Sequence, residues 1–310
     1  MLVKVLGSAA GGGFPQWNCS CSQCVGVRAG TLNARPRTQT QVAVSSNNTN
    51  WFLLNASPDL RQQVLACKEL SPAAGTRNSP IVAVLLTSAD VDAVMGLLHL
   101  REFHPLRIFS TPAVRRILTE ENGIFRVLCR SVPPVKWETL LLDRLTPLLP
   151  ATPADKNSGL FCRAVPLAGS FPDYVSDPLR NSLSPEEAVI GLSLVSREKR
   201  FFYAPNLPGM GDRWQHSFEE SDLALLDGTF WKDDELNSIQ KGSKSARAMG
   251  HLPLWGDRGL LRQPFRASKA KRVLIHINNT NPILNDSGPE SRIVRDAGWE
   301  IAYDGMDFTL

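Results

Sequence analysis

Short apolar runs separated by turn residues divide the chain into strand-sized segments. Such runs predict β-strands at 2–6, 40–45, 51–54, 81–86, 107–109, 139–142, 161–165, 223–226 and 272–277, and near residue 301. A hairpin is predicted over 189–203, with its turn at 197–199. The run 81–86 is apolar at every position, which is typical of a strand that is buried on both faces.

Helix signals follow several of these strands. Ser57 and Pro58 fit the N-cap and first position of a helix that ends near residue 67. Further helices are expected at 94–103, 112–119, 124–130 and 290–296. Strands come first, and strand–helix units follow in both halves. This order predicts an α/β protein in which two packed sheets lie between helices, an αββα sandwich.

The sandwich is expected to form one domain over residues 1–310. Residues 151–188 are rich in Pro, Ser and Asp, so we expect a mobile insertion there.

Composition and charge narrow the class of protein. Of the 310 residues 43% are hydrophobic and 21% are charged, which is typical of a globular protein. The formal net charge is only +4 and the basic residues are scattered, so the sequence does not require a nucleic-acid partner. No apolar run approaches the roughly 18 residues that span a bilayer, and the N-terminus does not resemble a secretory signal. We therefore expect a cytoplasmic protein without a membrane span.

Three cysteines lie close together in the sequence. Cys19, Cys21 and Cys24 follow a glycine-rich loop at 11–13, and three thiols at this spacing can converge on one zinc ion. The alternatives are unrelated thiols or a redox pair. The remaining cysteines, Cys67, Cys129 and Cys162, are isolated, and we expect them to be buried thiols.

Acidic and histidine residues follow predicted strands. Asp90 and Asp92 come directly after strand 81–86, where they could hold a metal or cap the next helix. His276 stands where a strand meets a polar loop, as a metal ligand or as a hydrogen-bonded residue. His251 lies on a glycine-containing loop that could present it as an acid or base. Asp227 fixes a turn or orients a ligand.

Several motifs together resemble the coenzyme PQQ (pyrroloquinoline quinone) biosynthesis protein B family of the metallo-β-lactamase superfamily. The matching stretches run from near residue 6 to residue 306. They include LGSAAGGGFPQWNC at 6–19, NASPDLRQQ at 55–63, DGTFWKDDE at 227–235 and HINNTNPIL at 276–284. The resemblance implies the metallo-β-lactamase sandwich and a structural zinc on the three cysteines. It leaves the fourth zinc ligand open among Asn279, Asp304 and a water.

The chain departs from the superfamily at the expected active site. The superfamily pattern His-x-His-x-Asp-His reads here Ser88-Ala-Asp-Val-Asp-Ala93. The mid-chain histidine is absent near residues 166–167, and the bridging aspartate is replaced near 205–206. A two-metal hydrolase needs several histidines and bridging carboxylates, so neither β-lactamase nor phosphodiesterase activity is expected.

The resemblance implies a role in PQQ biosynthesis as an iron-dependent oxygenase. The enzyme would hydroxylate the tyrosine ring of a Glu–Tyr precursor that derives from a peptide. Asp92, His276 and Asp90 would bind iron(II), and His251 would move protons. His251 falls where the related phosphodiesterases place a catalytic acid. Ala93 in place of an imidazole is expected to weaken the affinity for iron.

Two other functions are compatible with the sequence. The protein could be a non-catalytic carrier of PQQ or its precursor that assists transport toward the periplasm. Arg35, Arg37 and Arg101 would then contact the anionic quinone, although surface salt bridges are the alternative for these arginines. It could also be an interaction partner of other PQQ-pathway proteins, held together by zinc. The sequence leaves the oligomeric state, including a homo-oligomer, open.

Overall fold

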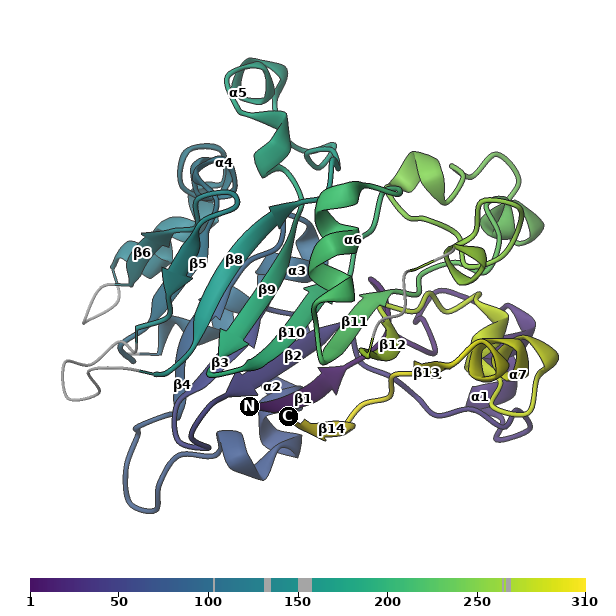
Figure 1. The fold of residues 1–310 in the computed structure, drawn as a ribbon, viewed down its shortest axis with the longest axis horizontal. Coiled ribbons are helices and arrows are strands. Elements are labelled where there is room, and N and C mark those ends of the chain that lie inside the picture. The colour runs from purple at the N-terminus through teal and green to yellow at the C-terminus, as the bar shows by residue number, and fades with distance from the viewer. Residues whose placement is uncertain (103, 131–134, 150–157, 264, 266–268) are drawn as a thin grey trace.

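The computed structural model describes all residues except 103, 131–134, 150–157, 264 and 266–268. In this part of the chain two seven-stranded sheets pack face to face (Figure 1). The first sheet has the order β14 (Asp307–Thr309), β1 (Leu2–Gly7), β2 (Gln41–Ser45), β3 (Trp51–Leu54), β4 (Ile81–Leu85), β5 (Arg107–Ser110) and β6 (Lys136–Thr139). The second has the order β13 (Trp299–Ile301), β12 (Lys271–Ile275), β11 (Leu223–Asp227), β10 (Lys199–Ala204), β9 (Ile190–Ser196), β8 (Phe161–Pro166) and β7 (Leu145–Pro147).

Each sheet combines antiparallel and parallel pairing. β14, β1, β2 and β3 pair antiparallel, whereas β3 to β6 pair parallel. In the second sheet β7 to β10 pair antiparallel, and β10 to β13 pair parallel. The last strand returns to the first sheet, where the Met1 ammonium donates to the Leu310 carbonyl at 2.9 Å. The two termini therefore lie side by side (Figure 1).

Helices cover the outer faces of the sandwich, with α6 across the second sheet (Figure 1). The α-helices are α1 (Ser22–Arg28), α2 (Leu60–Ala66), α3 (Val91–Val94), α4 (Pro112–Arg116), α5 (Asp177–Asn181), α6 (Asp212–Glu219) and α7 (Pro289–Asp296). Short 3-10 segments are η1 (Lys68–Leu70), η2 (Met95–Arg101), η4 (Gly123–Cys129), η5 (Pro185–Glu187), η6 (Glu235–Ser238), η7 (Arg247–Met249), η8 (Leu260–Arg262) and η9 (Pro282–Leu284). One π-helical segment, η3 (Ile117–Glu121), continues α4.

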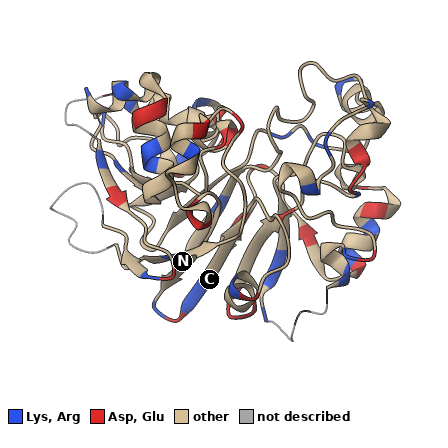
Figure 2. Cartoon of the chain, turned by 90° about the horizontal axis from the view of Figure 1, so that it is seen from above, with Lys and Arg blue, Asp and Glu red and all other residues tan. Residues whose placement is uncertain are grey.

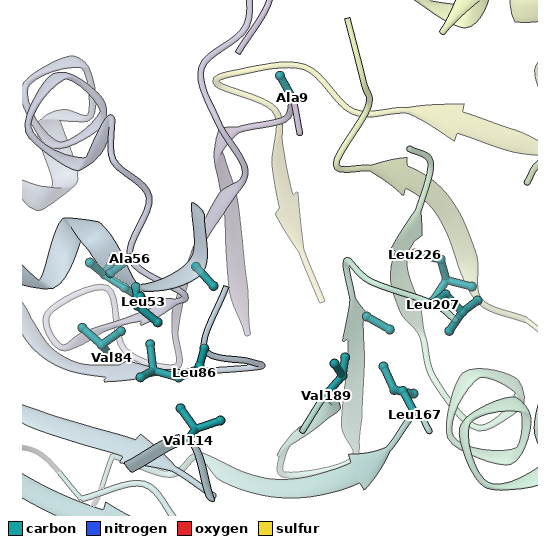
Figure 3. Close-up of a cluster of buried hydrophobic side chains, with 14 of the residues drawn as sticks. Ala9, Leu53, Ala56, Val84, Leu86, Val114, Leu167, Val189, Leu207 and Leu226 are labelled. Carbon is teal, nitrogen blue, oxygen red and sulfur yellow. The ribbon is translucent and has the colours of Figure 1, made fainter. Parts of the chain in front are cut away.

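Alternate residues of the strands fill two apolar clusters. One lies between the sheets and includes Phe52, Leu85 and Leu225. The other lies beneath the helices; its side chains include Leu53, Ala56 and Val84 from the first half and Leu207 and Leu226 from the second (Figure 3). Because successive residues of a strand face opposite sides, a strand covered on both sides is apolar throughout.

The αββα sandwich expected from the sequence is confirmed, and several local expectations are wrong. The helix expected at 94–103 forms only α3 and then the 3-10 segment η2; residue 103 lies outside the described part. The segment η2 packs closely at Gly96, where an added Cβ would lie 2.2 Å from the Ser57 carbonyl oxygen. The strand expected at 139–142 is β6, which ends at Thr139. The elements α1, α6, β7 and β14 were not expected.

Other regions also bear on the sequence expectations. The segment 151–188 contains β8, an integral strand of the second sheet, and α5; mobility of this segment stays a prediction. Basic and acidic residues are interspersed on both halves of the molecule (Figure 2). Within the described residues, no helix is both long and apolar enough to cross a membrane.

The packing of the core predicts that substitutions of two leucines differ strongly in their effect on the free energy of unfolding. Leu85 is fully buried between the sheets, whereas Leu65 on α2 is 71% exposed. Leu85→Ala is expected to lower the free energy of unfolding by about 2–5 kcal/mol, because it removes buried apolar surface and leaves a cavity. Leu65→Ala, the matched control, should change it by less than about 0.5 kcal/mol. Denaturant titration of both variants measures the two values; equal losses would contradict the described packing.

Candidate metal centres and cavity

Polar residues follow β4, β11 and β12 at one edge of the sandwich. Asp92 lies beyond β4, Thr229 beyond β11 and His276 directly after β12. All three line a cavity of about 970 Å³, together with Asp90 and His251. The strand ends thus gather residues that are far apart in the sequence around one cavity.

A fully buried carboxylate anchors this edge. Asp227 Oδ2 accepts hydrogen bonds from the Leu207 N–H and from His251 Nδ1, both at 2.8 Å. Asp227 Oδ1 accepts from the Thr229 N–H at 2.9 Å and from its hydroxyl at 2.6 Å. Burial raises the pKa of Asp227, but the charge and hydrogen bond of His251 outweigh it and hold that pKa below its usual value. The same pair raises the pKa of His251, against the opposing effect of burial.

Thr229 connects the carboxylate to both histidines. Its hydroxyl lies 2.6 Å from Asp227 Oδ1 and 2.8 Å from the His276 carbonyl oxygen, and both of these oxygens only accept. The single hydroxyl hydrogen of Thr229 is therefore donated to one of these two oxygens. His276 Nδ1, which lies 2.8 Å from the hydroxyl oxygen, must then donate its own hydrogen to that oxygen. His276 Nε2 then faces the cavity side, where Asp92 Oδ2 lies 2.9 Å away.

The two acidic residues of the α3 loop have different surroundings. Burial raises the pKa of Asp92, but the hydrogen bond and charge of His276 outweigh it and lower the pKa below its usual value. Asp90 Oδ2 instead accepts from Ser88 Oγ at 2.7 Å and from Asn206 Nδ2 at 3.4 Å. Burial and the Asp92 charge raise the pKa of Asp90. Asp92 therefore lies against His276, whereas Asp90 is held by Ser88 and Asn206.

Asp90, Asp92 and His276, the expected iron ligands, all line the cavity, and their assignment as ligands stays a prediction. Asp90 occupies the N-cap position of α3 without a side-chain cap hydrogen bond, and its bonds hold it to Ser88 and Asn206. Asp227, His251 and His276 have potential ligand atoms within 4.8 Å of one another. Since four donors already occupy both oxygens of Asp227, we assign Asp227 an orienting role. Asp92 and His276 remain as the closest pair of open donors.

The three cysteine sulfurs converge as the spacing predicted. Cys21 is the N-cap residue of α1, and the sulfurs of Cys19, Cys21 and Cys24 lie within 4.8 Å of one another. Burial raises the pKa of Cys21 to about 11. Asn279 covers the fourth side of the cluster, with its amide nitrogen 3.2, 3.8 and 3.3 Å from the sulfurs of Cys19, Cys21 and Cys24.

The candidates for the fourth ligand are thereby separated. Asp304 accepts from Ser8 Oγ at 2.7 Å and from the Thr38 backbone and hydroxyl at 2.6 and 2.8 Å. It is not part of the sulfur cluster, which argues against this candidate. A half-turn of the Asn279 side chain would exchange its amide nitrogen for the oxygen, so Asn279 fits the fourth position.

The three arginines considered for anion binding do not line the cavity. Arg37 is only 5% exposed and donates to Ser8 Oγ and to the Ala302 carbonyl. Arg35 lies over the Tyr303 ring, 4.7 Å from its centroid. Arg101 pairs with Glu102 and donates to the Leu98 carbonyl. The contact of Arg35 and Arg101 with a quinone stays a prediction. The burial of the Arg37 guanidinium argues against a contact between Arg37 and the quinone.

Sequence reasoning missed several residues of the site. Thr229 follows Asp227 and Gly228 at a strand end, a signal that indicates only a turn. Tyr174, Lys244 and Arg247 line the cavity from loops that carry no recognisable motif. Of the isolated cysteines, Cys162 is buried as expected, whereas Cys129 is exposed and Cys67 is half-buried.

The fold, the cysteine cluster and the polar residues at the cavity indicate the class of protein. Residues 50–277 match the family described as Beta-lactamase superfamily domain, in agreement with the metallo-β-lactamase sandwich. Coenzyme PQQ synthesis protein B of Azoarcus sp. is 41% identical over 314 residues, covering 100% of both chains. The protein of the same name from Klebsiella pneumoniae is 39% identical, covering 100% of this chain and 98% of its own.

A solved structure agrees with this relationship. The crystal structure of Zn²⁺-bound PqqB from Methylobacterium extorquens has a TM-score of 0.89, with 37% identity and full coverage of both chains. The chain belongs to the coenzyme PQQ synthesis protein B family.

Glu235 predicts a pH-dependent stability next to the cysteine cluster. Its carboxylate accepts from the Trp231 N–H at 2.6 Å and from the Thr280 hydroxyl, one residue beyond Asn279. Burial raises the pKa of Glu235 to about 7, well above the value of 4.5 for an exposed side chain. The folded protein therefore binds more protons between these values, so this contribution is present below pH 4.5 and is lost as the pH rises through 7.

Glu235→Gln retains a neutral acceptor and donor, so it should remove that pH dependence. The difference in unfolding free energy, variant minus wild type, should increase from pH 5 to pH 8 by up to about 3 kcal/mol. Denaturant titrations at both pH values measure it. A difference that does not change with pH would contradict the raised pKa.

Proposed function

We propose that this protein acts in PQQ biosynthesis as an iron(II)-dependent oxygenase that hydroxylates the tyrosine ring of the peptide-derived Glu–Tyr precursor. The family membership supports a role in PQQ synthesis. The observation that carries the chemistry is the Asp92–His276 pair at the cavity, with the Asp227–His251 pair beside it.

The cysteine cluster fits a structural zinc ion. The relative from Methylobacterium extorquens is described as Zn²⁺-bound. Three sulfurs within 4.8 Å and an amide group at the fourth side match the four-ligand geometry that zinc prefers. Zinc there would join the loop before α1 to the loop that follows β12, and so would hold His276 in place.

The Asp92–His276 pair fits one borderline metal ion. Imidazole nitrogen and carboxylate oxygen are the ligand types of non-haem iron(II) oxygenases. His276 Nε2 and Asp92 Oδ2 lie 2.9 Å apart, so these two side chains would be able to hold the same cation. Iron bound there would supply the activation of O₂.

His251 is suited to accept the phenolic proton of the substrate. Its Nδ1 is held by Asp227, so Nε2 remains available to a molecule in the cavity. The Asp227 carboxylate would stabilise the imidazolium that forms. A carboxylate that orients a general base commonly has this role. Thr229 keeps both imidazole rings at fixed positions, with ring centroids 5.4 Å apart.

The same surroundings argue against a two-metal hydrolase. Ala93, where the superfamily has a histidine, is 5% exposed and packs in the apolar cluster beneath the helices. Leu167 is also a core residue, and Asn206 binds Asp90 in place of a bridging ligand. Too few donors remain for two metal ions.

A carrier of PQQ or its precursor is the second candidate. The observation that favours it is the cavity of about 970 Å³, which is large enough for a tricyclic quinone. A carrier would bind without turnover and would not need metal at Asp92.

Metal content tests the assignment of the two centres. Wild-type protein purified without oxygen should contain about one zinc and up to one iron per chain. Asp92→Ala should lose the iron and keep the zinc, because the sulfur cluster is separate. Cys21→Ser should lose zinc, whereas Cys129→Ser, an exposed thiol away from the cluster, should not. Elemental analysis measures both metals; iron retained by Asp92→Ala would overturn the Asp92–His276 site.

The variant Ala93→His tests whether the iron site has been weakened in this chain. If wild type and Asp92→Ala both lack iron and Ala93→His binds it, the carrier becomes the better reading of wild type. If wild type binds iron as tightly as Ala93→His, the substitution at residue 93 is tolerated.

Turnover tests the role of His251. His251→Gln is expected to lower kcat for hydroxylation about 10²- to 10⁴-fold while the iron content is unchanged, because a proton acceptor is lost. His216→Gln is the matched control, since His216 lies exposed on α6. The measurement is the gain of one oxygen atom in the mass of the precursor, with O₂ and an added two-electron reductant, since the second oxygen atom leaves as water. An unchanged kcat in His251→Gln would exclude this role.

A further inference from the structure

Charged side chains of both signs line the cavity. Asp90 and Asp92 lie on the α3 loop after β4, next to His276. Lys244 and Arg247 come from the loop between β11 and β12, and they are the lysine and arginine side chains among the described lining residues. A ligand in this cavity would therefore have both metal-binding carboxylates and cations within the same walls.

Arg247 is a cation without an acidic partner among the described residues. Its guanidinium donates to the Arg258 carbonyl at 3.2 Å, and its side chain lies at the beginning of η7. An arginine stays charged at every physiological pH and can bind a carboxylate through two parallel hydrogen bonds. Arg247 is thus suited to an anionic ligand in the cavity.

The ion pair between Lys244 and Asp173 is weak. Its ammonium lies 2.9 Å from Asp173 Oδ2, and the two side chains are 61% and 87% exposed. Exposed ion pairs of this kind contribute little to stability, so a ligand carboxylate can replace Asp173 at small cost. The pair joins two loops that both line the cavity.

Aromatic side chains also line the cavity. Tyr174, Phe171 and Phe230 line the same cavity. Tyr174 donates its hydroxyl to the Ala89 carbonyl, which fixes the ring beside the α3 loop. Fixed aromatic rings favour an aromatic ligand, because such pairs gain energy beyond the area that they bury.

We propose that Lys244 and Arg247 bind carboxylates of an aromatic polycarboxylate whose ring lies in the cavity toward Asp92 and His276. Without a ligand, Asp173 forms an ion pair with Lys244, and a ligand carboxylate takes the place of Asp173 on binding. The identity of the ligand as PQQ or its precursor rests on the proposed function, but the binding residues do not depend on turnover. Unlike Arg35, Arg37 and Arg101, these two residues line the cavity.

Titration with PQQ, and with its trimethyl ester as the uncharged probe, tests this assignment. Arg247→Met should weaken PQQ binding about tenfold or more, and Lys244→Met about three- to tenfold. Asp173→Asn should bind PQQ more tightly, since it removes the competing carboxylate. Lys241→Met, an exposed lysine of the same loop that does not line the cavity, should leave the affinity unchanged. The ester should bind weakly and equally to all variants.

The same titrations in Asp92→Ala separate this inference from the oxygenase. An unchanged effect of Arg247→Met on PQQ affinity in that background would support carboxylate binding independently of the iron site. Absence of hydroxylation by wild type, with the same losses of affinity, would overturn the oxygenase alone. Ester and PQQ bound equally well by wild type, no PQQ binding up to millimolar concentration, or full affinity in Arg247→Met and Lys244→Met would each overturn it. Thermal unfolding of each variant confirms that a lost affinity does not reflect a lost fold.

Discussion

The buried Asp227 carboxylate is the constraint on which the site depends. A charge without solvent contact is costly unless it is paired and hydrogen-bonded. Here four donors from the Leu207 backbone, Thr229 and His251 occupy both oxygens. Any rotation of the carboxylate would leave donors unpaired, so the turn after β11 and the His251 loop are held together. The positions of both imidazole rings follow from this one group.

The loop after β12 connects the two candidate metal centres. His276 has a positive φ of 61°, a conformation that costs free energy in a residue other than glycine. Hydrogen bonds offset this cost: the Asn278 N–H donates to the Thr229 carbonyl, and Asn281 donates to the Gly228 carbonyl. Asn279, between them, contacts the three sulfurs. A metal on the cysteines would therefore also stabilise the strained backbone that presents His276.

The sequence predicted the strands well and the site only in part, for physical reasons. The central strands β2, β3, β4 and β11 are buried on both faces, so apolar runs such as 81–86 mark them directly, whereas β6, β7 and β14 are partly exposed. α1 and α6 are short, and their few apolar positions do not form a long periodic pattern. Thr229 could not be recognised, because its role depends on three partners that only the fold brings together. The sequence also does not show that the Arg37 guanidinium is buried, which argues against its proposed contact with an anion.

The departures from the superfamily motif have a common physical consequence. Removing imidazoles takes away metal donors, and it leaves the cavity edge to Asp92, His276 and the oriented His251. Asp90 is hydrogen-bonded to Ser88 and Asn206. In the proposed function, one metal position and one oriented base would face a cavity of about 970 Å³ instead of a compact two-metal centre. Such a cavity suits a large organic ligand better than a small hydrolysable group.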